Sequence, residues 1–258
     1  MASYDFKAQR LFCDAPLTAG VAVVPDRDQT HYLLNVLRLD VGAELLVFNG
    51  RDGEWLTRVA QRSKRALTLE AVRQVRAQTL LPPLDYLFAP LKRARLDYMV
   101  QKATEMGASR LRPVITQHTQ VTRVKGERLR ANVIEAAEQC GLLALPIVDE
   151  PQQLHAVLAG WGPDRPLIFC DEGAPEASPL TALRDAFSGM KEGAKDDAHN
   201  ERGPGVLIGP EGGFSEAERS ALLAMRSVVV ISLGPRILRA DTAAVAALAL
   251  VQATLAMP

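Results

Sequence analysis

The chain has 258 residues, a formal net charge of zero at neutral pH and a hydrophobic content of 48%, which suits one large or two modest domains. No apolar run reaches the roughly 18–20 residues that a membrane span needs, and the first residues contain no apolar signal segment. The three cysteines, Cys13, Cys140 and Cys170, lie far apart without a CxxC pair. We therefore expect a cytoplasmic protein with no membrane segment, no disulfide framework and no metal site.

The zero net charge hides an asymmetry along the chain. Residues 1–130 contain 21 Lys and Arg against 13 Asp and Glu, whereas residues 131–258 contain 9 against 17. A polyanionic partner would therefore be met mainly by the first half of the chain. Uneven solvation of the surface would explain the same asymmetry equally well.

Residues 1–78 are predicted to form mostly strands, with one helix. A helical spacing of apolar residues covers 28–38, and turn signals occur at Asn49-Gly50 and Asp52-Gly53. Short strands of this kind around one helix favour a compact β-barrel. The expected strands are 21–24, 45–48, 55–60 and 67–72.

Two prolines, Pro82 and Pro83, mark the best domain boundary, and residues 79–258 follow a different rhythm. Strands alternate with helices, which predicts a parallel sheet covered on both faces and hence the α/β class. Gly107 and Gly141 are placed to end two of the helices. Residues 188–205 are polar and predict a mobile surface loop. The expected strands are 84–89, 111–115, 147–148, 167–170, 206–208 and 228–233, and the expected helices are 95–106, 128–140, 152–158 and 242–256.

The strands at 206–208 and 228–233 each run into a loop that contains Gly and Pro. The first loop is GPEGG at 209–213, and the second is GPRILRADT at 234–242. Open α/β sheets bind ligands at the carboxyl ends of their strands, so two such loops predict two walls of one pocket. Neither loop is a phosphate-binding P-loop, and neither is a GxGxxG dinucleotide turn.

The pattern LIGPEGGFSxxE followed by LGPRILRADTA resembles the SPOUT methyltransferases, and specifically the RsmE family, which methylates N3 of a uridine in the decoding-region helix of 16S ribosomal RNA. Residues 92–107 and the pattern His31…Val36-Leu37-Arg38 also resemble that family. The resemblance implies a SPOUT domain over 79–258 with a deep trefoil knot, a PUA-like RNA-binding β-barrel over 1–78, and a homodimer. One departure is Asp241, where the family usually has Glu.

The resemblance also implies which residues carry the function. Arg236 and Arg239 are the expected catalytic residues, and no metal is expected. The expected RNA-binding residues are Arg10, Arg38, Arg58, Arg62, Lys92 and Arg95. The residues expected to bind S-adenosylmethionine are Leu207, Ile208, Gly209, Pro210, Glu211, Gly212, Gly213, Leu233, Gly234, Ile237, Leu238, Asp241 and Thr242. Of these, Glu211 and Asp241 could each instead cap a helix start; binding is favoured for Glu211, and both roles stay open for Asp241.

Methyl transfer to a uridine N3 requires alignment of donor and acceptor and stabilisation of a base that loses a weakly acidic proton. The planar, always charged guanidinium groups of Arg236 and Arg239 suit that electrostatic role, or a grip on phosphate. The four histidines, at 31, 118, 155 and 199, form no recognisable catalytic pattern and are expected to be structural or solvated. Three alternatives are a SPOUT enzyme that acts on another RNA such as tRNA, a non-catalytic RNA-binding assembly protein, and a nicotinamide-dependent enzyme, which the missing GxGxxG disfavours.

Overall fold

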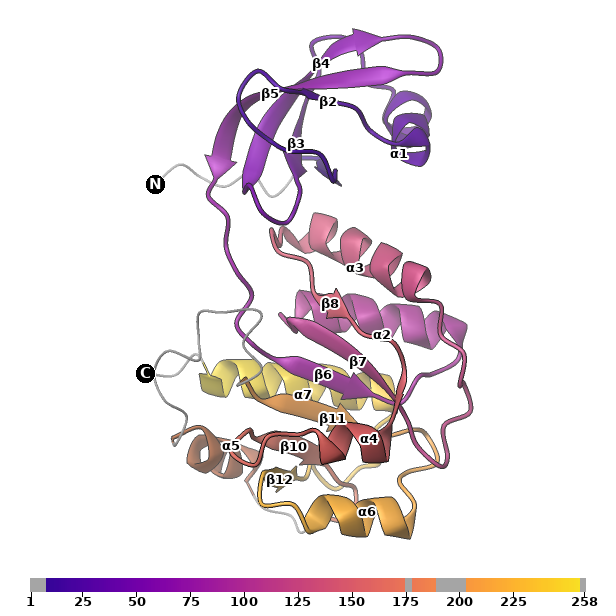
Figure 1. The fold of residues 1–258 in the computed structure, drawn as a ribbon, viewed down its shortest axis with the longest axis vertical. Coiled ribbons are helices and arrows are strands. Elements are labelled where there is room, and N and C mark those ends of the chain that lie inside the picture. Colours follow the sequence, from indigo (N-terminus) through magenta and orange to yellow (C-terminus); the bar gives the residue numbers. More distant parts are fainter. Residues whose placement is uncertain (1–7, 175–177, 189–202, 256–258) are drawn as a thin grey trace. The chain divides into compact units, whose positions relative to one another are not determined.

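The computed structural model describes residues 8–174, 178–188 and 203–255, in two compact units (Figure 1). Unit 1 consists of Met1–Leu80 and Ala137–Leu145, and unit 2 consists of Leu81–Ala136 and Pro146–Pro258. Most of the polar loop predicted at 188–205, with His199, lies outside the described residues.

Unit 1 contains a five-stranded sheet with the strand order β1-β3-β4-β5-β2. The first pair, β1 with β3, is parallel, and the other pairs are antiparallel. Four of the strands were predicted, whereas β1 was not, because three residues are too few to show an alternating pattern. The strands are β1 Arg10–Phe12, β2 Ala22–Val23, β3 Glu44–Phe48, β4 Glu54–Arg62 and β5 Leu67–Arg76.

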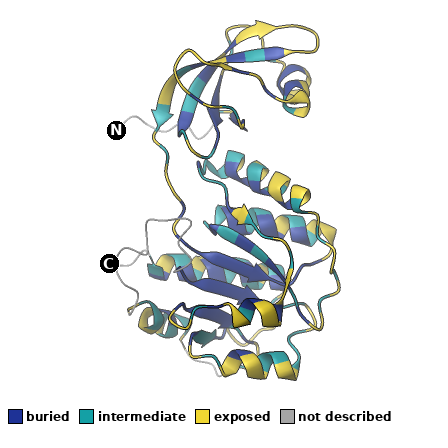
Figure 2. Cartoon of the chain, viewed as in Figure 1, coloured by how far each residue is buried: buried dark blue, intermediate teal, exposed yellow. Residues whose placement is uncertain are grey.

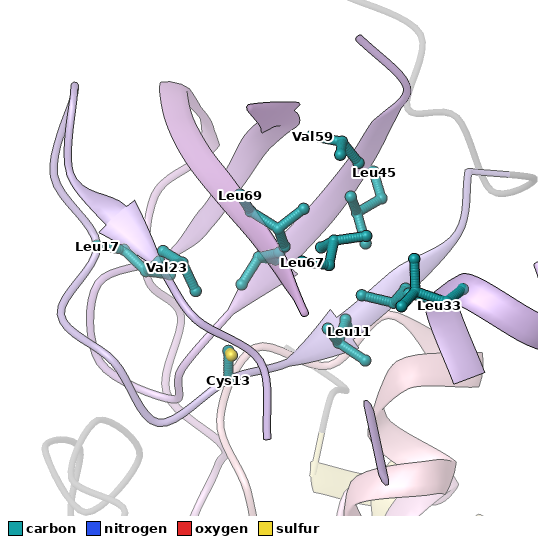
Figure 3. Packing of buried hydrophobic residues seen from close by; sticks show 11 residues of the cluster. Leu11, Cys13, Leu17, Val23, Leu33, Leu45, Val59, Leu67 and Leu69 are labelled. Carbon is teal, nitrogen blue, oxygen red and sulfur yellow. The ribbon is translucent and has the colours of Figure 1, made fainter. Parts of the chain in front are cut away.

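The strands of unit 1 surround one apolar core, in which Val23, Leu33 and Leu69 are fully buried (Figure 3). The helix predicted at 28–38 is shorter and changes type: α1 Arg27–His31 continues as a π-helical turn, Tyr32–Val36. Its start is fixed by a capping box, which satisfies backbone N–H groups that have no partner within the helix.

A short segment from much later in the chain completes unit 1. The backbone N–H of Phe12 donates to the Glu138 carboxylate at 2.8 Å. The Arg76 guanidinium donates to the Gly141 carbonyl at 2.7 Å. Residues 137–145 are therefore tied to the N-terminal sheet by hydrogen bonds, although sequence order separates them from it.

Unit 2 is built on a parallel sheet with the order β12-β10-β11-β6-β7-β8, and β9 pairs with β7 beside this path. The β6, β10 and β11 strands are largely buried (Figure 2), as expected for parallel strands covered on both faces. The predicted strands are confirmed, and β9 is additional. The strands are β6 Asp85–Phe88, β7 Arg110–Ile115, β8 Ile147–Val148, β9 Gln152–Gln153, β10 Leu167–Cys170, β11 Gly205–Ile208 and β12 Val228–Ile231.

Helices cover both faces of this sheet. On one face, Leu207 packs in a cluster with Leu154 of α4 and Leu222 of α6. On the other, α7 packs against β11 and against α2 and α5. The sequence did not predict α5 or α6, and the trefoil knot stays a prediction. The helices are α2 Arg93–Glu105, α3 Gly126–Cys140, α4 Leu154–Ala159, α5 Pro179–Ser188, α6 Glu216–Leu223 and α7 Ala240–Leu255.

Three further properties of the described ranges complete this picture of the fold. No helix there combines the length and apolarity that a bilayer crossing requires. The same residues hold no group of three or more His, Cys, Asp or Glu side chains arranged to bind a metal ion. All three cysteines are free thiols.

Candidate functional site

A pocket of about 620 Å³ lies where β10, β11 and β12 end in unit 2. The GPEGG loop after β11 and the GPRILRADT loop after β12 both line it, together with the first turn of α7. The predicted meeting of two glycine-containing loops at the carboxyl ends of parallel strands is therefore observed.

Most of the residues expected in this pocket line it, and four do not. The lining residues include Ile208, Gly209, Pro210, Glu211, Gly213, Leu233, Gly234, Arg236, Ile237, Leu238 and Arg239. The four expected residues outside the lining are Leu207, Gly212, Asp241 and Thr242.

Strand alternation explains the position of Leu207. Neighbouring side chains of a strand point to opposite faces of the sheet, so Ile208 lines the pocket while Leu207 joins the core beneath α4 and α6. A continuous apolar run in sequence does not show which of its residues faces the ligand side.

Helix geometry explains the two residues at the start of α7. The Asp241 carboxylate accepts a hydrogen bond from the Thr242 backbone N–H at 2.9 Å, and Asp241 is the acidic residue of the first turn. A carboxylate there is stabilised by the helix dipole. Asp241 therefore has a contact at the start of the helix in this structure, and its contact with the methyl donor stays a prediction.

The GPEGG loop contacts the loop that follows β7. The Nδ1 atom of His118 lies 3.1 Å from the Gly212 carbonyl and 3.2 Å from the Gly213 carbonyl. A Cβ added to Gly212 would lie 3.3 Å from the His118 Cβ. A larger residue at position 212 would therefore press on His118, while the contact of Gly212 with the methyl donor stays a prediction.

Two further contacts lie near this loop, one at the start of α6 and one in the GPEGG loop itself. The Gln117 backbone N–H donates to the Glu218 carboxylate at 2.8 Å, and Glu218 forms the capping box of α6 with Ser215. Glu211 forms an ion pair with Arg95 of α2. Arg95 was expected to bind RNA and Glu211 to bind the methyl donor, but in this structure each side chain neutralises the other.

A third wall of the pocket comes from the loop after β10, where Asp171, Glu172 and Gly173 line it. Asp171 is buried and pairs with Arg219 of α6 at 2.8 Å. The Asp171 carboxylate holds the pKa of Arg219 above its ordinary value, by hydrogen bonding first and by charge second. This wall was not predicted from the sequence. Its signal was present, because the predicted strand at 167–170 runs into Asp-Glu-Gly.

The two expected catalytic arginines are exposed in the second loop of the pocket. Within the described ranges, neither Arg236 nor Arg239 forms an ion pair with a carboxylate, whereas Arg95 and Arg219 do. The positive charge of these two side chains is therefore available to a ligand.

Cys170 also lines the pocket but has no nucleophilic character. Burial raises the pKa of its thiol to about 12, so the thiol stays protonated at neutral pH.

The expected RNA-binding residues of unit 1 fall into two groups. Arg10 is buried and forms an ion pair with the fully buried Glu54 at 3.1 Å, whereas its contact with RNA stays a prediction. The others are at the surface: Arg58 pairs with Glu44 and Arg62 with Asp40, while Arg38 is exposed with a φ of 53°. In unit 2, Lys92 is exposed at the start of α2.

Comparison with known proteins identifies the family of this chain. A model of the RNA methyltransferase domain matches residues 79–252, and a model of the RNA methyltransferase PUA domain matches residues 24–72. The ribosomal RNA small subunit methyltransferase E of Rickettsia conorii is 30% identical over 95% of this chain and 96% of its own length. The protein of the same name from Synechocystis is 32% identical over 88% of this chain and 71% of its own length.

Solved structures share the fold over nearly the whole chain. A methyltransferase from Legionella pneumophila, solved with S-adenosylmethionine, has a TM-score of 0.78 and 24% identity over 96% of this chain and 98% of its own. A ribosomal RNA small subunit methyltransferase E from Neisseria gonorrhoeae, also bound to S-adenosylmethionine, has a TM-score of 0.77 and 22% identity over 95% of this chain and 97% of its own. The chain therefore belongs to the RsmE family of RNA methyltransferases, within the SPOUT fold.

Proposed function

We propose that this protein transfers the methyl group of S-adenosylmethionine to N3 of a uridine in the decoding-region helix of 16S ribosomal RNA. The observation that carries the proposal is the pocket at the ends of β10, β11 and β12, which two glycine-containing loops line. Arg236 and Arg239 belong to the second loop and have no carboxylate partner among the described residues. The names of the curated relatives support small-subunit ribosomal RNA as the substrate.

The residues present fit S-adenosylmethionine. A volume of about 620 Å³ is within the usual range of small-molecule sites. A Cβ added to Gly234 would meet nothing within 4 Å, so the backbone there leaves open space for a ligand. Carboxylates and arginines both line the pocket, and the donor carries both positive groups and a carboxylate. When bound, S-adenosylmethionine supplies an activated methyl group with its own leaving group.

The chain's own residues would act mainly on the acceptor. Uridine N3 carries a proton of weak acidity, and losing it leaves negative charge on the base. A guanidinium from Arg236 or Arg239 stabilises such charge without becoming deprotonated. A hydrogen-bond donor that is held in place before the reaction stabilises the transition state most in a site that excludes water. We assign this role to Arg239 first, because it immediately precedes α7 and its carbonyl accepts from the Ala243 N–H of that helix.

The RNA would be held by the surface arginines. Arg38, Arg58 and Arg62 of unit 1 and Lys92 of unit 2 are exposed or half-exposed, and phosphate contacts from such side chains position a nucleic acid. Arg95 would join them only by leaving Glu211. We also propose that the active form is a homodimer, as the family resemblance implies.

Mass mapping of modified nucleosides tests the proposal. Small-subunit RNA from a strain that lacks this gene should have lost one N3-methyluridine, and the gene supplied on a plasmid should restore it. An unchanged small-subunit RNA together with a modification missing from tRNA would replace this function by that of a SPOUT enzyme with another substrate.

A further inference from the structure

Glu172 is a carboxylate of the pocket wall for which the structure provides no partner in the described part of the chain. Three acidic residues line the pocket. Asp171 pairs with Arg219, and Glu211 pairs with Arg95. Glu172 is exposed, which leaves its negative charge available to a ligand.

The loop that carries Glu172 is fixed at both sides of this residue. The preceding Asp171 is buried and holds Arg219 of α6 through two hydrogen-bonded nitrogens, at 2.8 and 3.0 Å. The other oxygen of the Asp171 carboxylate accepts from the Gly173 backbone N–H at 3.0 Å. Glu172 therefore lies between two residues whose contacts hold the loop against α6.

The carboxylate also lies close to the GPEGG loop. A Cβ added to Gly213 would lie 3.6 Å from the Glu172 Oε1 atom. The carboxylate of Glu172 thus lies in the wall formed by the loop after β10 and close to the backbone of the loop after β11.

From this geometry we propose that Glu172 is the acidic recognition residue of the pocket and accepts hydrogen bonds from the methyl donor. The inference rests on the proposed use of S-adenosylmethionine. That molecule offers polar hydrogens on its ammonium group, its ribose hydroxyls and the amino group of its adenine. A carboxylate accepts hydrogen bonds from any of them, and charge-assisted hydrogen bonds are roughly twice as strong as neutral ones. An acidic side chain also binds ribose hydroxyls in dinucleotide-binding α/β folds.

The test is calorimetric titration of the full-length chain and its Glu172→Gln variant with S-adenosylmethionine, S-adenosylhomocysteine and adenosine. Glutamine keeps the shape but loses the charge. We expect affinity for the first two ligands to fall about tenfold or more. Adenosine has the ribose and the adenine amino group but no ammonium, so an equal loss for adenosine assigns Glu172 to the nucleoside part of the donor, and unchanged adenosine binding assigns it to the ammonium.

The matched control is Glu216→Gln, which changes an exposed carboxylate of α6 outside the pocket lining and should leave all three affinities within about twofold. Thermal melting of both variants, and of Glu172→Ala, verifies the fold. Unchanged binding of all three ligands, or a loss confined to S-adenosylmethionine, overturns the proposal, because S-adenosylhomocysteine retains the ammonium, the ribose hydroxyls and the adenine amino group. A wild-type chain that does not bind S-adenosylmethionine would contradict the proposed function itself.

Discussion

Arg236 and Arg239 differ from the other arginines around the pocket in having no carboxylate partner in the described ranges. Arg95 and Arg219 each neutralise an acidic side chain of a pocket loop, and so stabilise the walls. The two unpaired arginines lie in the second glycine loop itself. Arg95 and Arg219 therefore stabilise the pocket, whereas Arg236 and Arg239 can act on a substrate.

Replacement of Arg239 by lysine tests its role in the transition state. Lysine keeps a positive charge but loses the planar fork. We expect the single-turnover rate of methylation to fall about a hundredfold, comparable to the loss of one preorganised donor, while affinities for S-adenosylmethionine and RNA change much less. Arg226→Lys, at an exposed position outside the pocket lining, is the matched control. A normal rate at saturating RNA with weakened RNA binding would make Arg239 a phosphate anchor.

Replacement of His118 tests whether the GPEGG loop needs support from outside the pocket, because His118 contacts this loop without lining the pocket. His118→Ala removes the hydrogen bond to the Gly212 and Gly213 carbonyls, and such a bond is worth about 1 kcal/mol. We expect S-adenosylmethionine affinity, measured by calorimetry, to fall roughly five- to tenfold. His155→Ala changes an exposed histidine of α4 and should have no effect. Unchanged affinity in His118→Ala would show that the loop keeps its shape unaided.

The sequence indicated few of these residue-scale contacts. It indicated that two glycine loops face one pocket, because strand ends in a parallel sheet share an edge. It did not show that Gly212 lies close to His118, or that Arg10 is buried against Glu54. Both depend on contacts between residues far apart in the chain, and a single sequence has no local signal for such contacts.

Several elements with a strong local signal were predicted, whereas one with a visible signal and others without any were missed. The glycines predicted to end two helices, Gly107 and Gly141, have φ angles of 76° and 77°, as a left-handed C-terminal residue requires. In contrast, α6 is a short helix that was not predicted, although its capping box, Ser215 with Glu218, is visible in the sequence. The three-residue β1 has no comparable signal.

The pairing of α2 with α3 depends on an ion pair whose contribution changes with pH. Hydrogen bonding from the Arg128 guanidinium holds the pKa of Asp97 below its ordinary value, and Asn132 donates to the same carboxylate at 3.0 Å. A carboxyl whose pKa is lowered on folding stabilises the fold above the unfolded pKa of about 4. That contribution is lost as the pH falls through the folded pKa.

We therefore expect Asp97→Asn to lower the free energy of unfolding at pH 7, and the difference from the wild type to shrink as the pH falls below about 4. Urea unfolding followed by circular dichroism across that range measures both quantities. Asp164→Asn, at an exposed position before β10, serves as the control. A destabilisation that stays constant down to about pH 2, below the usual carboxyl range, would contradict the ionic origin of the contact.

At the scale of the whole molecule, the chain consists of two units that are not simple segments of sequence. Residues 137–145 belong to unit 1 through their hydrogen bonds to Phe12 and Arg76. The break predicted near Pro82 and Pro83 is visible in sequence because prolines interrupt strand pairing. The return of residues 137–145 to unit 1 could not be predicted, because nothing local distinguishes the end of α3 from its beginning.

The proposed RNA surface of unit 1 predicts a particular salt dependence. In the full-length chain, replacing Arg38, Arg58 and Arg62 together by alanine should weaken binding to small-subunit RNA. The slope of log affinity against log salt should become shallower by roughly 0.7–0.9 for each phosphate that the variant no longer neutralises. Arg226→Ala controls for a general loss of positive charge. An unchanged slope in filter-binding titrations would exclude these three arginines from the RNA interface.

The proposed function requires that this chain is itself the enzyme that methylates a small-subunit uridine at N3. The most direct measurement incubates the purified wild-type chain with S-adenosylmethionine and small ribosomal subunits that lack the modification, followed by nuclease digestion and mass spectrometry of the nucleosides. We expect one N3-methyluridine per small-subunit RNA with the wild-type chain, and a greatly reduced yield of this nucleoside with Arg239→Lys. Binding of S-adenosylmethionine and RNA without any methylated uridine would contradict the proposed function.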